Sequence, residues 1–377
     1  MVTYRKARPD ECAAYTGFAS MVFSHGDYVE NFAKLIPKAY GPGVDRSDIH
    51  YLAVDDEKGI RGLVAVLPNE LYIGGETLKI GFVGTVSVHP DARGEGHMKK
   101  LMNMAIEDMK AQGVDLGLLG GHRQRYEYFG FAKGGVGYSI NVGAPNVRHA
   151  LKNVDASAVT FEEITEDSPW VDAAYALFAK QEIRFRRDRE EFVVICRSYN
   201  AKLWAVLENG RFAGYIICNE GKDSIAEILV DSMETLDKAL KAWIVQNELP
   251  RVYLIFPEWK REELKHLGVY AGGTSYEMRV QSSIYNPRRV LKAMLTAKAE
   301  YARMENGSMC FEIEGDRFTV TVQDGKVAIT DGGENPVCMN LLQASQLFAY
   351  PFDYEGKVQT PMGWFPLPLY ESSPDAF

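Results

Sequence analysis

Hydrophobic positions in the first 150 residues fall into short runs and one helical repeat. The short runs are separated by polar turns such as Asp55–Gly59, which is typical of β-hairpins. From Met98 onward the apolar side chains recur every three or four residues, which predicts an amphipathic helix that ends at Gly113. The expected order is hairpin, strand, helix and strand, at residues 50–67, 81–88, 98–112 and 114–119.

A second stretch repeats this order, with strands expected at residues 203–207, 213–218 and 225–230 and a helix at 234–246. A strand, helix, strand order implies a right-handed crossover and a mixed sheet. In the first unit, an Arg- and Gly-containing turn at residues 89–98, here called the anion turn, precedes the helix. The corresponding residues 231–235 contain neither Arg nor Gly but two carboxylates. We interpret the second unit as a duplicated fold without this turn.

The last part of the chain changes character. A helix is expected from Asn286 to about Met304, followed by short strands joined by Gly-containing turns and a helix at residues 341–348. Residues 363–377, here called the tail, contain three prolines and are apolar until the last few residues, which are mostly polar. Because disordered tails are usually polar, this tail is expected to dock, either on its own domain or elsewhere in the protein.

Composition limits the class of protein. A chain of 377 residues is long enough for two or three domains. The net charge of −9 argues against nucleic acid as a main partner. No window resembles a membrane span or a secretory signal. Five scattered cysteines, none in a Cys-x-x-Cys pair, argue against a disulfide framework and a zinc site, so we expect a cytoplasmic protein without metal.

The anion turn carries the most specific chemistry. Its backbone N–H groups and the positive end of the following helix would converge on a group the size of a pyrophosphate. A P-loop string is absent, and a dinucleotide fold would need a third glycine. The remaining match is Arg/Gln-x-x-Gly-x-Gly/Ala, which residues 93–98 fill with Met98 where Gly or Ala is usual.

At this motif the chain resembles the GCN5-related N-acetyltransferases, whose loop binds the pyrophosphate of acetyl-CoA. Together with a degenerate second copy and a C-terminal domain similar to sterol carrier proteins, the whole chain resembles the Eis (enhanced intracellular survival) family. Residues 126–131 are similar to the family's Tyr-x-x-Phe-Gly-Tyr segment. The predicted fold is therefore α/β with mixed sheets: a catalytic acetyltransferase domain, a degenerate copy and a sterol-carrier-like α+β domain, at residues 1–150, 151–285 and 286–377.

The resemblance also implies roles for individual residues. Tyr126 would be the general acid that protonates the leaving thiolate, and the α-carboxylate of Phe377 would be the base. The ordinary pKa of such a carboxylate, about 3.3–3.7, makes it a weak base unless its surroundings change it. Spacing alone leaves other candidates open, namely Tyr128 as the acid and His89, His97 or His122 as the base.

Cofactor contacts follow from the same motif match. Peptide groups of the strand end would bind the pantetheine amides, the anion turn would bind the pyrophosphate, and a second loop would lie nearby. The residues expected in these three groups are Val86, Ser87 and Val88; Arg93, Gly94, Glu95, Gly96, His97, Met98 and Lys99; and Gly121 and His122. The side chain of Glu95 is expected to point to solvent.

The activity implied by the resemblance is acetyl transfer from acetyl-CoA to an amine of a polyamine such as an aminoglycoside, in a homohexamer. Lysine side chains of peptides or proteins are the alternative acceptors. A lipid- or sterol-binding carrier and a non-catalytic assembly subunit are alternatives of other classes.

Overall fold

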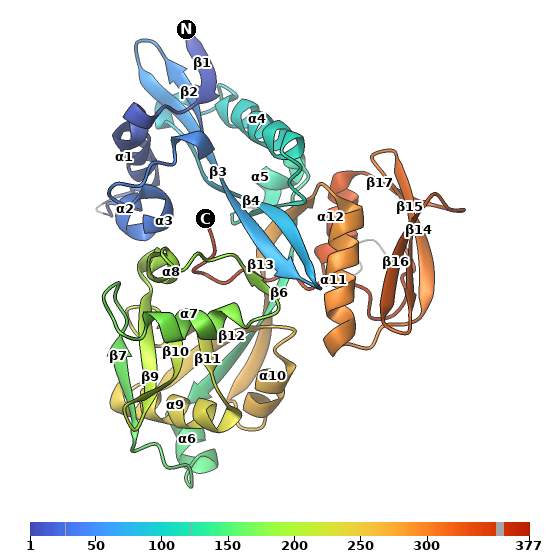
Figure 1. Ribbon diagram of the computed structural model, residues 1–377. Helices are drawn as coiled ribbons and strands as arrows, with labels where there is room; N and C mark the ends of the chain where they lie inside the picture. The colour runs from blue at the N-terminus through green and yellow to red at the C-terminus, as the bar shows by residue number, and fades with distance from the viewer. Residues whose placement is uncertain (27, 122, 352–357) are drawn as a thin grey trace.

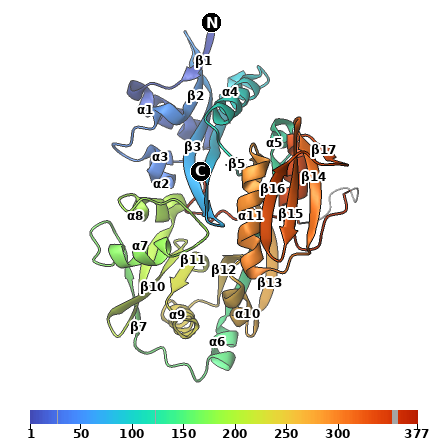
Figure 2. The same cartoon turned by 45° about the vertical axis from the view of Figure 1, so that its right-hand side comes forward.

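The computed structural model describes residues 1–26, 28–121, 123–351 and 358–377. Three bodies are visible in Figure 1: an N-terminal one at the upper left, a second below it and a third at the right. The C-terminus lies between the first and second bodies, near β3, and Figure 2 shows it there from a second direction. Nothing in the described part of the chain forms a helix long and apolar enough to cross a membrane.

The first body contains the predicted hairpin, strand, helix and strand, which confirms that part of the sequence analysis. Three short helices before the hairpin were not predicted. Its elements are β1 (Val2–Lys6), η1 (Pro9–Glu11), α1 (Cys12–Phe23), α2 (Phe32–Leu35), α3 (Pro37–Tyr40), η2 (Ser47–Ile49), β2 (His50–Asp55), β3 (Gly59–Ile73), β4 (Glu76–Val88), η3 (Pro90–Ala92), α4 (His97–Ala111), β5 (Leu116–Leu119), α5 (Arg123–Tyr126), η4 (Glu127–Phe129) and β6 (Ala132–Gly143).

The second body repeats the order of the first, as predicted from the spacing. Its elements are α6 (Ala144–Ala150), β7 (Val159–Glu163), α7 (Val171–Ala179), β8 (Arg184–Phe185), α8 (Phe192–Cys196), η5 (Ser198–Asn200), β9 (Lys202–Glu208), β10 (Arg211–Cys218), β11 (Ser224–Val230), α9 (Met233–Gln246), β12 (Arg251–Pro257), α10 (Arg261–Gly268) and β13 (Gly273–Ile284).

The third body is a four-stranded sheet, in the order β16-β15-β14-β17, with two helices. The first helix ends at Tyr301, three residues before the predicted end. The elements are α11 (Pro287–Tyr301), β14 (Gly307–Ile313), β15 (Asp316–Gln323), β16 (Lys326–Asp331), β17 (Val337–Met339) and α12 (Leu341–Ala349). Phe311, Phe318 and Phe348 are fully buried and fill the space between this sheet and its helices.

The first two bodies share one mixed sheet, in the order β1-β2-β3-β4-β5-β13-β6-β12-β11-β10-β9-β7. Strand β13 lies between β5 and β6, and β6 in turn pairs with β12. Each unit therefore takes a strand from the other unit's part of the sequence. Hydrophobic periodicity cannot reveal this exchange, because a strand buried on both faces has the same pattern with either neighbour.

Each unit contains one parallel pair of strands joined by a crossover helix. In the first unit β4 pairs with β5 and α4 connects them; in the second, β11 pairs with β12 through α9. The apolar face of α4, which includes Leu101, Met102 and Met109, packs on one face of β2–β5. The opposite face of the first unit packs against α1–α3 and the third body in a continuous core.

The tail leaves the third body and ends in the first. Trp364 is fully buried and donates its indole N–H to the carbonyl oxygen of Glu305, and the N–H of Leu367 donates to Phe348 O at 2.6 Å. Beyond Leu369 the chain passes between the first two bodies to Phe377, which is 9% exposed. The expectation that the tail docks is confirmed, and it docks on more than its own domain.

Candidate active site

The site is built around a break in strand pairing. Strands β4 and β5 pair in parallel from Ile80 to Val83 of β4, and the described residues show no further pair between them. On its other edge, β4 has a bulge against β3, where Thr85 and Val86 stand opposite the single residue Val64. Thr85 has a left-handed φ of 52°, a strained conformation for a β-branched residue. The bulge turns the end of β4 away from β5, so its peptide groups are available to a ligand.

Residues 86–88, which the sequence predicted to contact the pantetheine arm, form this diverging end. Ser87 pairs with Leu63 and Val88 with Gly62 on the β3 side. The Ser87 hydroxyl is buried and donates to the carbonyl oxygen of Thr85 at 3.1 Å. It therefore stabilises the bulge, which is a role the sequence did not predict.

The anion turn has the expected open backbone. Gly94 and Gly96 both have left-handed φ values, 91° and 83°, and a Cβ at either position would meet nothing within 4 Å. Helix α4 begins at His97 without a side-chain cap. Among the described residues, no hydrogen bond uses the N–H groups of Gly94, Gly96, His97, Met98 or Lys99. An uncapped helix end with free N–H groups and glycine backbone attracts an anion.

His97 and Glu95 of the turn are hydrogen bonded to each other. His97 is buried, with Nδ1 hydrogen bonded to the hydroxyl of Tyr4 at 2.8 Å and Nε2 to Glu95 Oε2 at 2.9 Å. Both ring nitrogens are therefore occupied, which makes His97 a weaker candidate for the base. The Glu95 side chain is exposed, as expected, and this hydrogen bond ties its carboxylate to His97.

The remaining side chains of the turn lie at its surface. His89 accepts a hydrogen bond from the N–H of Asp91 and so closes the turn. Arg93 is exposed, and the ammonium of Lys99 lies over the ring of Tyr128 at 4.9 Å. His122 lies outside the described residues.

Tyr126 lies beside the end of β5. Its side chain is buried, and a Cβ on Gly121, whose φ is 135°, would approach Tyr126 Cε2 to 2.8 Å. The ring thus lies against the backbone just beyond β5. Burial raises the pKa of the Tyr126 phenol, and the charge of Arg125 opposes this only in part. A phenol in such surroundings keeps its proton, as a general acid must before it acts. Tyr128, the alternative, is 66% exposed.

Phe377 ends the chain beside the end of β4. A Cβ on Gly84 would lie 2.6 Å from the carboxyl carbon of Phe377 and 2.7 Å from its oxygen, so the terminus occupies space that only glycine leaves. The ring of Phe377 is stacked on Tyr40 at 6.3 Å with an interplanar angle of 11°. Val83 and Leu119 are paired neighbours, so Gly84 and Gly121 lie just beyond the same pair. The structure therefore brings Tyr126 and Phe377 to one end of the β4–β5 pair.

A hydrogen-bonded chain that sequence reasoning missed supports this arrangement. The Tyr40 hydroxyl is hydrogen bonded to Thr85 Oγ1 at 2.6 Å and to His50 Nε2 at 3.0 Å. His50 Nδ1 is 2.7 Å from the carbonyl oxygen of Arg46, which can only accept, so Nδ1 carries the proton and Nε2 is the acceptor. Burial lowers the pKa of His50 to about 4 and keeps it neutral. Tyr40, His50 and Thr85 lie singly on three different elements, α3, β2 and β4, so they form no local sequence motif.

The exchanged strand β13 also reaches the site. Gln281, which is 3% exposed, donates from Nε2 to the carbonyl oxygen of Gly121 at 2.9 Å. It fixes the backbone on which Tyr126 rests. Because Gln281 pairs with Leu119 across the exchange, the first unit's site is completed by a residue from the second unit's sequence.

A small cleft lies on the second-unit side of the tail, between β11 and β12. Aromatic and aliphatic side chains line most of it, including Phe178, Phe185 and Trp259. Its two carboxylates, Glu227 and Asp375, both accept hydrogen bonds from Arg187. Within the described residues, no group of His, Cys, Asp or Glu side chains is arranged to hold a metal ion.

Comparison with known proteins agrees with the geometry of the first unit. Residues 3–134 match the family model described as an acetyltransferase (GNAT) domain. This segment therefore resembles a GNAT acetyltransferase domain in sequence. GNAT domains bind acetyl-CoA and act on amines, and the chain is accordingly an acyltransferase. A search of curated proteins gave no match.

Solved structures extend the similarity of fold to the whole chain. A GCN5-related N-acetyltransferase from Anabaena variabilis superposes with a TM-score of 0.70 at 16% identity, with 100% of both chains covered. Eis1 from Mycobacterium abscessus gives 0.62 at 13% identity, over 100% of this chain and 99% of that one. A GCN5-related N-acetyltransferase from Kribbella flavida gives 0.63 at 13%, over 90% and 88%. At these identities the similarity concerns the fold alone.

Proposed function

We propose that this GNAT enzyme is an N-acetyltransferase that uses acetyl-CoA, with the Tyr126 phenol as general acid and the Phe377 carboxylate as base. A bond forms between the acceptor nitrogen and the acetyl carbon, and the bond from that carbon to sulfur breaks. The carboxylate takes the proton that the nitrogen loses, and the phenol gives one to the thiolate. The single observation that carries the proposal is that both groups lie at the end of the β4–β5 pair, Phe377 beside Gly84 and Tyr126 beside Gly121.

The residues present fit acetyl-CoA, which supplies the acetyl group as a thioester. The uncapped end of α4, with Gly94 and Gly96 left-handed and open, suits the pyrophosphate. The diverging edge of β4 at Val86–Val88 suits the amides of an extended arm. Arg93 and Lys99 add positive charge at the mouth of the turn. These three features lie in sequence along one strand-to-helix connection.

The acceptor is an amine, and two observations bear on its class. The Eis-like fold and the acidic net charge favour an aminoglycoside, as the sequence suggested. In the cleft beside the tail, however, both carboxylates are hydrogen bonded to Arg187, and the lining is largely apolar. This favours an acceptor with one amine on an apolar body over a polycation, because desolvated positive charges need unpaired carboxylates. Lysine side chains of peptides remain a third class.

We also propose that the chain belongs to the Eis family and assembles as a homohexamer. Residues 286–377 are proposed to form a domain similar to sterol carrier proteins. The proposed boundaries stay at 150 and 285, with β6 and β13 exchanged between the first two domains. A lipid carrier is less well supported, because aromatic side chains fill the core of the third body.

The test follows thiol release from acetyl-CoA with aminoglycosides, lysine peptides and apolar monoamines as acceptors. Tyr126→Phe and a chain extended by Gly-Ser after Phe377 are compared with the unmodified enzyme. Each should lower kcat by about a hundredfold, within the usual range for losing one acid or base. Tyr128→Phe is the matched control, because this exposed ring lies on the next short helix and should leave kcat unchanged.

Three outcomes would contradict separate parts of the proposal. Unchanged turnover in the extended chain removes the carboxylate from the reaction. Unchanged turnover in Tyr126→Phe, or an equal loss in Tyr128→Phe, removes Tyr126 as the acid. If no amine releases thiol, the N-acetyltransferase assignment fails.

A further inference from the structure

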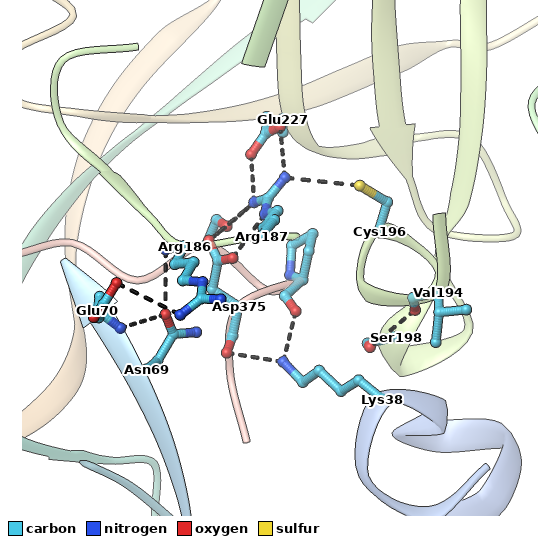
Figure 3. A network of polar contacts seen from close by, with 12 residues as sticks. Lys38, Asn69, Glu70, Arg186, Arg187, Val194, Cys196, Ser198, Glu227 and Asp375 are labelled. Atoms are coloured by element: carbon cyan, nitrogen blue, oxygen red, sulfur yellow. Dashed lines mark hydrogen bonds and ion pairs between the residues drawn. The ribbon is translucent and has the colours of Figure 1, made fainter. Parts of the chain in front are cut away.

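The tail is held by two buried cations that come from different bodies. Lys38 on α3 donates from Nζ to the carbonyl oxygens of Pro374 at 2.8 Å and Asp375 at 2.9 Å. Arg187, just after β8, donates from Nε and Nη2 to the two carboxylate oxygens of Asp375 at 2.8 and 2.9 Å. Figure 3 shows the two side chains approaching Asp375 from opposite sides. Both are over 90% buried from solvent, so the contacts are not weakened by water.

Arg187 is itself held in place on the second unit. Its guanidinium donates to both oxygens of Glu227 on β11, at 3.1 and 2.8 Å, and lies over the ring of Phe178 at 4.4 Å. Strand β8 pairs with Leu71 and Tyr72 of β3, which ties this segment to the first unit. A guanidinium with two bidentate carboxylate partners has little rotational freedom. Arg187 therefore fixes the tail relative to both units.

The tail also contacts the diverging strands of both units. Tyr370, Ser372 and Asp375 line the cleft between β11 and β12, and two residues later Phe377 lies against Gly84 of β4. Strand β11 pairs with β12 only at Ser224 and Ile225, so this cleft corresponds in topology to the β4–β5 opening of the first unit. In the second unit this opening anchors the tail, whereas in the first unit it receives the terminal carboxylate.

We propose that Lys38 and Arg187 are positioning residues that act through Asp375 to hold the terminal carboxylate of Phe377 beside Gly84. The inference rests on the proposed role of that carboxylate. Only two residues separate Asp375 from the terminus, so a change in the position of Asp375 moves the carboxylate directly. A misplacement of about 1 Å at a reacting group can cost about a hundredfold in rate.

The experiment uses the full chain with Asp375→Asn and Lys38→Met, and exposed Lys34→Met as the matched control. Three quantities are measured: kcat, KM for acetyl-CoA, and the rate at which a carboxypeptidase releases Phe377. Asp375→Asn and Lys38→Met should lower kcat at least about tenfold with KM changed less than about twofold, and should speed release at least about tenfold. Thermal unfolding identifies any variant that does not fold, and Arg187→Lys, which keeps the charge, should lose less activity than Arg187→Met.

A chain that lacks Phe377 separates positioning from general damage. In that background the terminal carboxylate belongs to Ala376 and is set back by one residue from Gly84, so the same substitutions should cause no further loss of kcat. An equal loss in both backgrounds, or an unchanged release rate, overturns the inference. If deletion of Phe377 leaves kcat unchanged, the proposed base role fails instead, and the release rates alone then decide whether Lys38 and Arg187 hold the terminus.

Discussion

The two units have the same succession of strand, turn, crossover helix and strand, yet the entrances to their helices differ. At α4 the entrance is Gly96, left-handed and without a side-chain cap. At α9 the Ser232 hydroxyl accepts a hydrogen bond from the N–H of Thr235 at 3.0 Å and contacts the Thr235 hydroxyl. Asp231 and Glu234 place carboxylates beside it. The cap already uses one N–H group of this helix end, so the second unit does not repeat the open turn of the first.

The units differ again at the first residue beyond each parallel pair. In the first unit this residue is Gly84, and the terminal carboxylate fills the space that a side chain would occupy. In the second unit it is Ala226, and the next residue, Glu227, binds Arg187. One opening therefore admits the end of the chain and the other anchors it. The duplication has divided the parts of one site between two units.

The largest effect is expected from Gly84→Ala. This substitution gives the first unit an alanine at the position where the second unit has Ala226. The new Cβ would overlap the backbone carboxyl group of Phe377, which cannot move aside as a flexible side chain could. We expect kcat to fall by about a hundredfold, as for loss of the base. Gly17→Ala, where a Cβ meets nothing within 4 Å, is the control. Equal kcat in the two variants would show that the carboxylate is not needed at Gly84.

Gly96→Ala tests the open turn directly. It adds a Cβ and a backbone strain of about 1–2 kcal/mol at a left-handed position. We expect KM for acetyl-CoA to rise about tenfold while kcat changes little, measured by steady-state thiol release. Gly210→Ala in the hairpin of the second unit, with φ 70° and the same open surroundings, carries the same strain. A similar rise in KM for Gly210→Ala would attribute the effect to strain rather than to the anion turn.

The part of the tail that lies between the two units can be tested through Glu371, which is expected to make stability depend on pH. Burial raises the pKa of Glu371 to about 8. The charge of Lys38 opposes this shift, and that of Asp375 adds to it. The other charged or titratable groups near Glu371 are Arg279 and Tyr199. A folded-state pKa above the ordinary value of 4.5 means that stability falls as pH rises from 4.5 to about 8. Glu371→Gln should remove this loss. Melting temperatures at pH 5 and pH 8 check it, and an equal difference between variant and parent at both values would contradict it.

The smallest effect is expected from Ser232→Ala in the second unit. Loss of this cap should cost about 1 kcal/mol of stability, seen as a lower melting temperature. Both kcat and KM for acetyl-CoA should stay unchanged, because the capped helix end of α9 binds no cosubstrate. A change in KM would mean that the second unit also takes part in cosubstrate binding.

Sequence patterns alone determined the local parts of this protein. The hairpins, both crossover helices and the open glycine turn could be predicted, because periodicity, turn residues and backbone freedom are properties of neighbouring residues. The turn was also the one motif specific enough to suggest acetyl-CoA. The roles of Tyr126 and Phe377 came from family resemblance and remain predictions.

Only the tertiary structure decided which residues far apart in the sequence are in contact. The exchange of β6 and β13, the contact of Gln281 with Gly121, the chain from His50 to Thr85 and the two cations on Asp375 all join residues far apart in sequence. Apart from the strand exchange, each depends on single polar side chains whose roles are set by burial and by partners from other elements. Such roles have no local pattern, because burial and partners are set when the chain is folded.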